Sequence, residues 1–593
     1  MTQVQALSVD EIQSIEIINN PSAKYEAEGR AVVLIKRKAT IADGYKVNLS
    51  EVASWRRRFN NYASLNASFK KNAWELKSNV AYQQLTFWES LQTEFETKQP
   101  AFSMDRTGTF VGPRPTFIIG SGIYYQLKNG GYLSSNFNWR FHHTDGETDS
   151  NATILSEGVQ STDKTRIEDN GERDFFTSNL NYNQPLRAGN LFLGVQFSHY
   201  NRGDISAIFD ENNSQSQLLQ NRDQLFSTNA LATRMDYERT LNENIKWETG
   251  INYYKADADA FAFFQFSTPT DAFQSDYDYA EKNYAAYTQF GGMIDQLQYA
   301  IGLRYELTEV QGGFEQSNTL LIDRQQPIFF PRLSLSHPID STKSIAFNYN
   351  KTVRRPNYLN ASSISTYSNP FMEFSRNINL LPTITQEASL NFQWGQRSIE
   401  WSYSKGSNPV FFSIRNDPDS NRAIMFPDNF EQIQNWSCRL ISPFQYKKWS
   451  SNNVLIATIS RVTDDRASSD TPQPYLYFYS NHRLSLPQQF TAGLNFFHIG
   501  KRKDGIFSRN AVSSWGASLS KTFNKQWQAT VQLNDIFRGR VFKDSFTVNQ
   551  FETTNTFFAD AKAVEVSMRY SFGGDWKSTF QNREVDEQLN RMN

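Results

Sequence analysis

Histidines are the side chains in this chain best suited to bind a transition metal, but their spacing does not suggest a site. Only two of the six are adjacent, and the others lie far apart in the sequence, whereas the histidines of a metal site usually lie closer together. Adjacent residues in a strand point to opposite faces, so that pair cannot chelate one ion together. We therefore predict no metal site and no cofactor. The histidines are His142, His143, His199, His337, His482 and His498.

The acidic segment from Asp145 to Glu172 could in principle bind Ca²⁺. It lacks the D-x-[DN]-x-[DN]-G spacing of a calcium-binding loop, which favours a solvated loop. A hydrolase would need a serine or aspartate nucleophile held at a fixed distance from a histidine. No G-x-S-x-G motif is present. We predict that the chain is not an enzyme and has no catalytic residues.

Alternation of apolar and polar residues predicts long strands. Mean hydropathy is −0.60 although 15% of residues are aromatic. No apolar run approaches the roughly 20 residues of a membrane helix, whereas alternating runs of about ten to thirteen suffice for a tilted transmembrane strand. Such strands place lipid-facing and lumen-facing side chains in turn. We expect Trp139, Phe141, Trp247, Ile251, Tyr570 and Phe572 to face outward, and Asn138, Arg140, Lys246, Glu248 and Arg569 to face inward.

Short and long links separate these runs in turn, as in barrels with short periplasmic turns and long external loops. Pairing each short link with its flanking runs predicts an all-β fold, a single transmembrane antiparallel β-barrel of about 22 strands, with 20 and 24 as alternatives. It extends from Tyr45 to Phe572, and an even strand number puts both ends on the periplasmic side. The short links are 70–72, 128–131, 241–244, 337–343 and 524–526, and the long ones are 90–112, 144–172, 201–223, 352–385 and 538–555.

The charges of the chain nearly cancel, with 60 Lys and Arg against 61 Asp and Glu. This balance gives no case for a nucleic-acid partner. The basic run Trp55 to Arg58 is a local exception, and we interpret it as a loop tip facing anionic lipopolysaccharide. The single cysteine, Cys438, excludes an internal disulfide and is predicted to be a packing residue.

The N-terminal stretch identifies a related family. Residues 12–29 read IQSIEIINNPSAKYEAEG and are followed by the apolar run 31–35 and by three basic residues at 36–38. This pattern resembles the end of the plug domain in TonB-dependent outer-membrane receptors. The family usually has a glycine pair after the acidic turn, where this chain has Arg30 and Ala31.

The resemblance continues through the barrel, where further motifs follow in the family's order. The last of them is similar to a barrel-insertion signal, an alternating strand that ends in an aromatic residue. The motif segments are 284–290, 301–306, 330–336, 353–358, 379–382, 534–537 and 564–572.

The resemblance implies three parts: residues 1–40 as the C-terminal remnant of a plug domain, 41–573 as the outer-membrane barrel, and 574–593 as a periplasmic tail with a short helix from Glu584 to Arg591. Met1 to Asp10 lacks the basic start and apolar core of a secretory signal. The earlier part of the plug and the segment that pairs with TonB are also missing. We expect a fragment of a longer protein, with a naturally plugless or minimally plugged barrel as the alternative.

Energised, TonB-dependent uptake across the Gram-negative cell outer membrane is the function that the resemblance implies. The ligand would be too large or too scarce for porins: a siderophore complex, a glycan, a peptide or a cobalamin. Its binding residues are unknown. The expected partners are outer-membrane lipid, lipopolysaccharide, and the TonB complex in the full-length protein. The alternative is a non-transporting barrel that acts as a scaffold or surface-binding protein.

The plug remnant itself is predicted to contain two short strands, 15–17 and 32–35. Buried backbone groups are not left unpaired. The two strands are therefore expected to pair as a hairpin through the turn 20–29, or to stay loosely held. In either case we expect a largely unblocked lumen.

Overall fold

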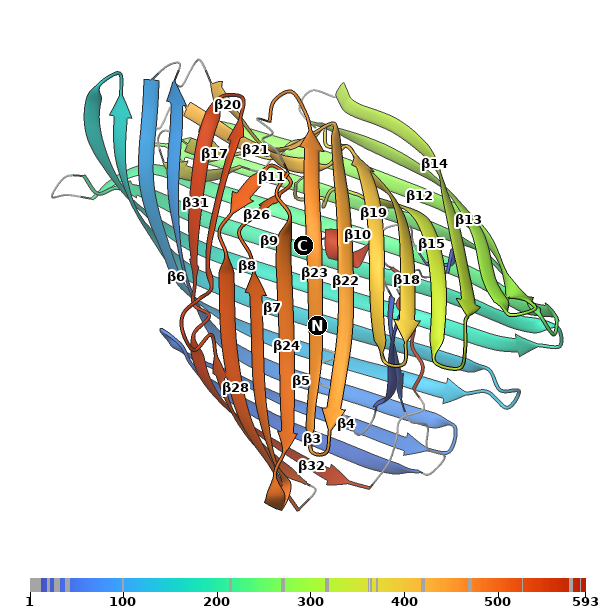
Figure 1. Ribbon diagram of the computed structural model, residues 1–593. Helices are drawn as coiled ribbons and strands as arrows, with labels where there is room; N and C mark the ends of the chain where they lie inside the picture. Colours follow the sequence, from blue (N-terminus) through green and yellow to red (C-terminus); the bar gives the residue numbers. More distant parts are fainter. Residues whose placement is uncertain are drawn as a thin grey trace.

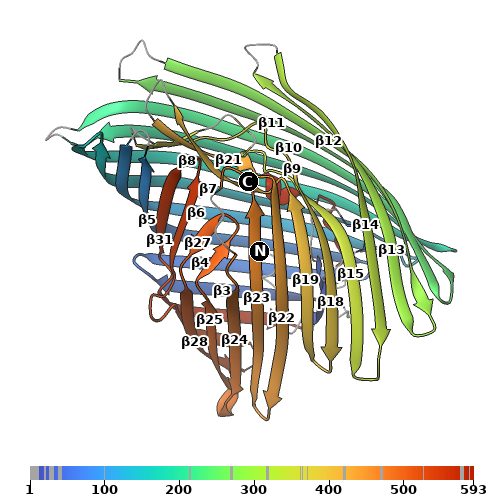
Figure 2. The same cartoon turned by 45° about the horizontal axis from the view of Figure 1, so that its top comes forward.

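The computed structural model is one closed antiparallel barrel, seen from the side in Figure 1 and tilted in Figure 2. Among the described residues, no helix is long and apolar enough to cross a membrane. The structure describes residues 12–18, 22–25, 32–37, 43–98, 101–212, 216–267, 272–314, 319–360, 362, 365–369, 372–417, 422–467, 472–524, 526–574, 580–586 and 588–592.

Twenty-two strands form the wall, which confirms the predicted fold class and strand number. They are β3 Gly44–Trp55, β4 Phe59–Lys71, β5 Trp74–Lys98, β6 Ala101–Gln126, β7 Tyr132–Ser156, β8 Val159–Leu186, β9 Gly189–Asp210, β10 Gln217–Asn242, β11 Ile245–Phe266, β12 Ala272–Ile294, β13 Leu297–Phe314, β14 Thr319–Pro338, β15 Lys343–Arg354, β18 Thr383–Trp394, β19 Arg397–Ser407, β22 Gln432–Tyr446, β23 Trp449–Thr463, β24 Tyr475–Ser485, β25 Phe490–Ile499, β28 Val512–Phe523, β29 Trp527–Asn534 and β32 Ala563–Gly573.

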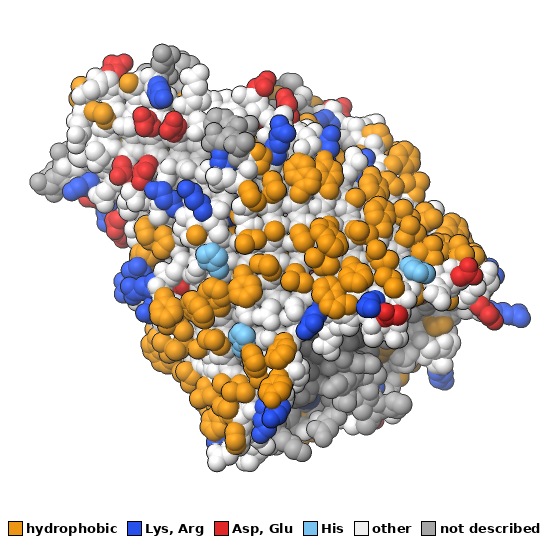
Figure 3. Space-filling model, in the orientation of Figure 1, with side chains coloured by type: hydrophobic (Ala, Val, Ile, Leu, Met, Phe, Trp, Pro, Cys, Tyr) orange, Lys and Arg blue, Asp and Glu red, His pale blue; other side chains and the backbone are white. Residues whose placement is uncertain are grey.

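The barrel closes where the first wall strand meets the last. β3 pairs antiparallel with β32, from Lys46 opposite Gly573 to Trp55 opposite Val564. Every backbone donor and acceptor along this seam therefore finds a partner, and the sheet has no free edge there. Figure 3 shows the outer face, where apolar side chains form a broad band and charged side chains gather above and below it.

The alternation predicted from sequence matches the exposed side chains. Trp139 and Ile251 are 42% and 59% exposed on the outer face. Glu248, from the same strand as Ile251, is 8% exposed and contacts residues inside the barrel. Because the side-chain period of a strand is two, one correct position fixes the rest of the strand.

Most of the predicted long links are not loops but continuations of the strands. β5 and β6 stay paired from Trp74 opposite Tyr125 to Lys98 opposite Ala101, so residues 90–112 are hairpin rather than loop. The same holds for 144–172, which lies in β7 and β8. A strand needs only about 9–11 residues to cross a bilayer, so these hairpins extend well beyond the apolar band.

Shorter strands lie at the long-hairpin end and inside the barrel. β1 (Ile12–Ile18) pairs with β2 (Val32–Arg37), which is the hairpin, the first of the two arrangements that the sequence predicted for this stretch. A separate four-stranded sheet, called the inner sheet below, has the order β16-β17-β21-β20. Its strands are β16 Thr366–Asn369, β17 Met372–Phe374, β20 Val410–Asp417 and β21 Arg422–Asn429.

Four further strands extend the wall at the same end, and two short 3₁₀ turns complete the described secondary structure. The strands are β26 Arg502–Asp504, β27 Phe507–Arg509, β30 Val541–Val548 and β31 Phe551–Ala559, and the turns are η3 Pro487–Gln489 and η4 Leu589–Arg591.

Candidate lumenal site

The turn between β1 and β2 is fastened to the inner wall through its own backbone and short side chains. Ser22 Oγ donates to Glu248 Oε2 at 2.7 Å, and the Ala23 N–H donates to Gln289 Oε1 at 2.8 Å. Lys24 Nζ lies 3.8 Å from Glu248 Oε1. Ala23 is fully buried. The Ser22-Ala23-Lys24 part of the resemblance motif is therefore a docking element.

Two arginines of the wall hold the carbonyl groups of the same turn. Arg332 Nη1 donates to the Ser22 carbonyl at 2.9 Å, and Arg234 Nη2 donates to the Lys24 carbonyl. These charge-assisted bonds are stronger than neutral ones. The turn thus contacts β10, β11, β12 and β14 at once.

The C-terminal tail, defined here as residues 580–592, also lies inside the barrel. It begins where the Phe580 ring packs 5.8 Å from the ring of Tyr124 on β6. Asn181 on β8 donates from Nδ2 to Asn582 Oδ1 and to the Arg583 carbonyl, both at 2.8 Å. In Figure 1 the turn η4 near the end of the tail is visible within the outline of the barrel.

The N-terminal turn and the tail meet at one carboxylate of β10. Asp236 Oδ2 lies 2.7 Å from Arg583 Nη1 and accepts from Arg234 Nε at 2.9 Å. Tyr287 donates its hydroxyl to Asp236 Oδ1 at 2.7 Å. The Arg583 guanidinium also lies 5.8 Å from the ring centroid of Tyr25. Both ends of the chain are thus coupled through the Asp236 cluster.

The middle of the tail binds one glutamine of β9. The backbone N–H groups of Val585 and Asp586 donate to Gln196 Oε1 at 2.9 and 3.2 Å. Ser198 Oγ donates to Asp586 Oδ2 at 3.3 Å. A Cβ built on Gly194 would lie 2.6 Å from a Val585 methyl, so the glycine provides the space that the tail occupies.

The end of the tail carries a buried ion pair with the wall. Arg591 donates from Nη1 and Nη2 to the two oxygens of Glu281 on β12, each at 2.7 Å. Its guanidinium stacks 4.4 Å from the ring centroid of Tyr358, whose hydroxyl bonds that of Tyr254 at 2.9 Å. Met592 is fully buried beside them.

Small side chains explain why the lumen accommodates this segment. Alanines point inward along β10 and β11, and they belong to the same apolar cluster as Val585 and Met592 of the tail. Methyl groups leave room where larger side chains would fill the wall. The alanines are Ala230, Ala232, Ala256, Ala258 and Ala260, none of them more than 4% exposed.

A second buried ionic cluster anchors the segment that follows β15. Glu306 on β13 accepts from Arg304 on its own strand and from Arg355, which lies just past the end of β15. All three side chains are nearly inaccessible to solvent. The paired charges and their hydrogen bonds compensate for the loss of water. The cluster thus holds the start of the segment that leads from β15 to the inner sheet.

The inner sheet packs against the wall at the long-hairpin end. Its residues Met372, Ile414 and Met425 share an apolar cluster with Phe95 of β5 and Ile154 of β7. Arg466, just past β23, pins this sheet by donating to Asp428 Oδ2 at 2.6 Å. The mouth of the barrel therefore contains an ordered element with its own buried core.

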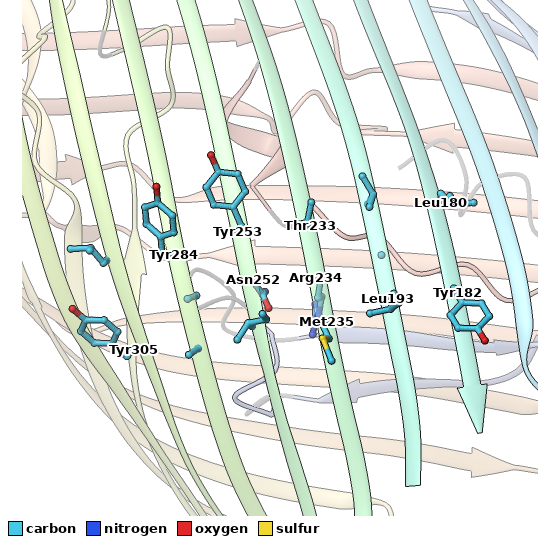
Figure 4. Close-up of a pocket in the computed structure, with 16 residues that line it drawn as sticks. Leu180, Tyr182, Leu193, Thr233, Arg234, Met235, Asn252, Tyr253, Tyr284 and Tyr305 are labelled. Atoms are coloured by element: carbon cyan, nitrogen blue, oxygen red, sulfur yellow. The ribbon is translucent and has the colours of Figure 1, made fainter. Parts of the chain in front are cut away.

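A groove on the outer face has a different character. It measures about 760 Å³ and is shown in Figure 4. Its floor is formed by Ala286, which lies directly opposite Ile251 on one side and Tyr305 on the other. Leu193 and Met235 add to its apolar walls. A groove of this kind suits a hydrocarbon chain better than a polar solute.

The structure does not bring together the residues that the sequence analysis considered as metal ligands. His142 is buried inside while His143 faces outward toward Glu172, as the alternation predicted. Among the described residues, no group of three or more His, Cys, Asp or Glu could hold a metal ion. The basic run lies at the tip of the β3–β4 hairpin, where Arg57 stacks 3.5 Å from the ring centroid of Trp88. Its contact with lipopolysaccharide stays a prediction.

The expected position of the tail differs from the structure. The sequence predicted a tail that hangs below the barrel with a helix over Glu584–Arg591. The described residues instead lie along the inner wall, with only the 3₁₀ turn η4 at Leu589–Arg591. The charged tail finds opposite charges in the lumen, at Asp236 and Glu281. The tail and the inner sheet lie inside the barrel together with the turn 22–25, so the lumen is more filled than the sequence predicts.

One feature of the sequence, unused in the prediction of the tail, is compatible with its docking. The alternating alanines of β11 are unusually small for the inner wall of a barrel, which indicates that another segment approaches closely. No comparable signal identified Arg583 or Arg591, because their partners are more than 300 positions away in the sequence.

Comparison with known proteins agrees with this fold. The sequence model of the outer membrane protein beta-barrel family matches residues 205–570. No curated protein matches the chain. Among solved structures, "Copper transporter OprC" is 12% identical, with a TM-score of 0.67 over 96% of this chain and 87% of that chain.

Two further solved structures are similar. A mutant of the ferric enterobactin receptor PfeA of Pseudomonas aeruginosa, in complex with enterobactin, is 11% identical, with a TM-score of 0.62 over 95% of this chain and 86% of that one. The FrpB iron transporter of Neisseria meningitidis is 10% identical, with a TM-score of 0.61 over 95% and 88%. All three proteins are named as receptors or transporters.

Proposed function

Because the chain belongs to the outer membrane protein beta-barrel family, we propose that it is an outer-membrane receptor that takes up its ligand through the lumen, with energy delivered by TonB. The barrel lies in the outer membrane. Uptake would need the lumenal segments to yield and the inner sheet to admit ligand from the long-hairpin end. The short-turn end would face the periplasm.

The observation that carries this proposal is the way the lumenal segments are held. The turn 22–25 contacts the wall through a few hydrogen bonds and ion pairs, not through an apolar core. Water can replace such contacts one at a time, so a modest pull can release the segment. Packed apolar cores resist displacement because all their contacts must be lost together.

The turn 22–25 and the tail are linked by contacts, so a force on the turn can also affect the tail. Arg234 binds the Lys24 carbonyl and Asp236, and Asp236 binds Arg583 of the tail. Withdrawing the N-terminal turn removes the contact of Arg234 with Lys24 and frees that arginine to move. Asp236, which pairs with Arg583 of the tail, is then no longer held in place by Arg234. Release of one segment would thus loosen the other.

A second candidate function is a barrel that binds a surface partner without transport. The inner sheet favours it, because this sheet has a buried apolar core and fills the mouth with an ordered element. The two functions differ in whether the lumenal segments have to move.

The test measures ligand accumulation in cells that lack the native gene and express this protein from a plasmid. Labelled ferric siderophores, copper, cobalamin, oligosaccharides and peptides are offered with and without TonB. A disulfide between Ala23→Cys and Gly302→Cys ties the turn to the wall. We expect accumulation of one ligand class that requires TonB and stops when the disulfide is oxidised. The proposal is overturned if accumulation depends neither on TonB nor on oxidation of the disulfide, or if the ligand binds at the surface without accumulating.

A further inference from the structure

We propose that the inner wall of β6 to β9 carries a binding site for a multiply charged anion, which gives the ligand class of the receptor proposed above and rests on that proposed function. The site is the arginine row, defined as Arg114, Arg140, Arg173 and Arg202 together with His142. A ligand with several carboxylate or phosphate groups fits it.

Strand register brings the members of the row together. His142 on β7 lies directly opposite Arg173 on β8, and Arg173 lies directly opposite Arg202 on β9. Directly opposite side chains share a face, with Cβ atoms about 4.5–5.5 Å apart. Three cationic or ionisable side chains therefore stand in one line across three strands.

The other two arginines extend this line on the same face. Arg140 precedes His142 by two positions, so both side chains point inward. Arg114 lies two positions before Thr116, the residue opposite His142. Figure 1 shows β6 to β9 side by side in the wall.

Acidic residues near the row do not balance its charge. Asp204 Oδ1 lies 3.6 Å from Arg173 Nη2, and the other oxygen of Asp204 accepts from Arg202 Nε. Among the described residues, no carboxylate forms an ion pair with Arg114 or Arg140. Arg114 instead stacks 4.3 Å from the ring centroid of Phe87. Glu89 and Asp169 also lie near the row and act on its arginines through charge, so three carboxylates face four guanidinium groups.

Buried donors in the row await an acceptor. The donors Arg114 Nε and Arg173 Nε are inaccessible to solvent and have no hydrogen-bond partner among the described residues, and the same is true of the ring nitrogen His142 Nε2. Arg376, on the segment after β17, leaves its Nε in the same state while Nη1 donates to Asn360. Buried polar groups of folded proteins are nearly always satisfied, so such a concentration indicates a missing partner. Anionic oxygens match guanidinium donors in geometry and in charge.

Space for the rest of a ligand lies nearer the long-hairpin end. A cavity of about 310 Å³ is lined by Asp169, four positions before Arg173 on β8, and by Ser206, four positions after Arg202 on β9. Arg106 and Arg222 also line it, and Phe374 of the inner sheet forms part of its cover. The cavity carries both signs of charge, since Glu89 and Asp169 line it beside the two arginines, and it lies next to the row.

The test uses the purified full chain in detergent and measures binding by isothermal titration calorimetry. The probes are tricarballylate for carboxylates, inorganic tripolyphosphate for phosphates, and maltotriose as a neutral solute of comparable size. We expect at least one of the two anions to bind and maltotriose not to bind. The double variant Arg173→Gln/Arg202→Gln should weaken anion binding by about tenfold or more, as expected for lost charge-assisted hydrogen bonds.

A matched control tests whether anion binding depends on the row itself or on any positive charge inside the barrel. Arg439→Gln removes an inward arginine of β22 that pairs with Glu400 at 2.7 Å, and it should leave anion binding unchanged. Heat-modifiable migration on gels shows whether each variant is folded. If the double variant does not fold, Arg140→Gln replaces it, because this side chain is exposed within the lumen.

The outcomes are distinct for the two proposals. Anion binding equal in the row variants and the unmodified chain, or absent from both, overturns the arginine row and leaves TonB-dependent uptake to stand on its own test. Anion binding that depends on the row supports the site even if no uptake is measured. The probe that binds better identifies carboxylate or phosphate as the preferred group.

Discussion

Arg591 and Glu281 form a two-point ion pair between residues 310 positions apart, with both nitrogen-to-oxygen distances at 2.7 Å. The side chains are 5% and 1% exposed. A bidentate guanidinium–carboxylate pair fixes direction as well as distance. The pair therefore determines where the C-terminal tail ends inside the barrel.

Breaking this pair should release the end of the tail. Removing one partner of a buried ion pair costs about 3–5 kcal/mol, because the other charge stays buried without compensation. We expect Arg591→Met to make the tail sensitive to carboxypeptidase digestion, followed by intact mass. The unmodified tail should resist digestion.

Two controls accompany this experiment. Asn590→Ala changes an exposed neighbour and should leave the tail resistant. The exchange Arg591→Glu/Glu281→Arg should restore part of the resistance that either single change removes. Equal digestion of Arg591→Met and Asn590→Ala would show that the ion pair does not hold the tail.

Removal of the tail should widen the lumen. The last wall strand ends at Gly573, so a chain that stops at Gly574 keeps every wall pairing. We expect its single-channel conductance in planar bilayers to exceed that of the complete chain, since the tail no longer fills space beside β8 to β12. Identical conductance of the two would mean that the tail does not restrict ion flow.

The N-terminal turn should form a disulfide with the wall. A Cβ on Gly302 would lie 2.9 Å from Ala23 Cβ, so a small shift reaches the usual disulfide separation of about 3.8 Å. Oxidised Ala23→Cys/Gly302→Cys should show the bond by mass spectrometry. Leu303→Cys in place of Gly302→Cys gives the control, because Leu303 is 45% exposed on the outer face. Similar bond formation in both pairs would contradict the docked turn.

Arg466 should control the attachment of the inner sheet. It donates to Asp428 and Asp464, and the Glu431 N–H also donates to Asp464. We expect Arg466→Ala to speed hydrogen exchange in β21, measured by mass spectrometry, with β4 as an internal reference. Unchanged exchange in β21 would show that apolar packing alone holds the sheet.

The same cluster predicts a pH dependence. Burial raises the pKa of Asp464, but hydrogen bonds from Arg466 and from backbone N–H groups outweigh it and hold that pKa below its usual value. A lowered pKa in the folded state gives stability that is present above the unfolded value of about 3.9 and is lost as pH falls further. Exchange in β21 should therefore stay slow at pH 5 and rise only below about pH 4. A rise between pH 7 and pH 5 would contradict this assignment.

The two faces of β7 should respond differently to charge. Phe137 is 39% exposed on the outer face, while its neighbour Asn138 points inward. An arginine on the lipid face costs about 2–4 kcal/mol near the middle of the bilayer. Phe137→Arg should thus give less folded, heat-modifiable barrel than Asn138→Arg. Equal yields would contradict the assigned register.

Local patterns of the sequence were enough to determine the wall of this protein. Alternation in β7 and β11 predicted the outward position of Trp139 and Ile251, because side-chain direction in a strand depends only on parity along the chain. The strand number followed from the short turns. The long links predicted as loops are instead continuations of the hairpins, which stay in register beyond the apolar band.

The contents of the lumen were decided only by the tertiary structure. Arg591 meets Glu281, and Arg583 meets Asp236, across separations that no local pattern encodes. The arginine row likewise arises from register between three strands, which places His142, Arg173 and Arg202 in line. Parity fixes which face a side chain takes. Only closure of the barrel fixes which side chains meet inside it, because that depends on strand stagger and on where the chain ends re-enter.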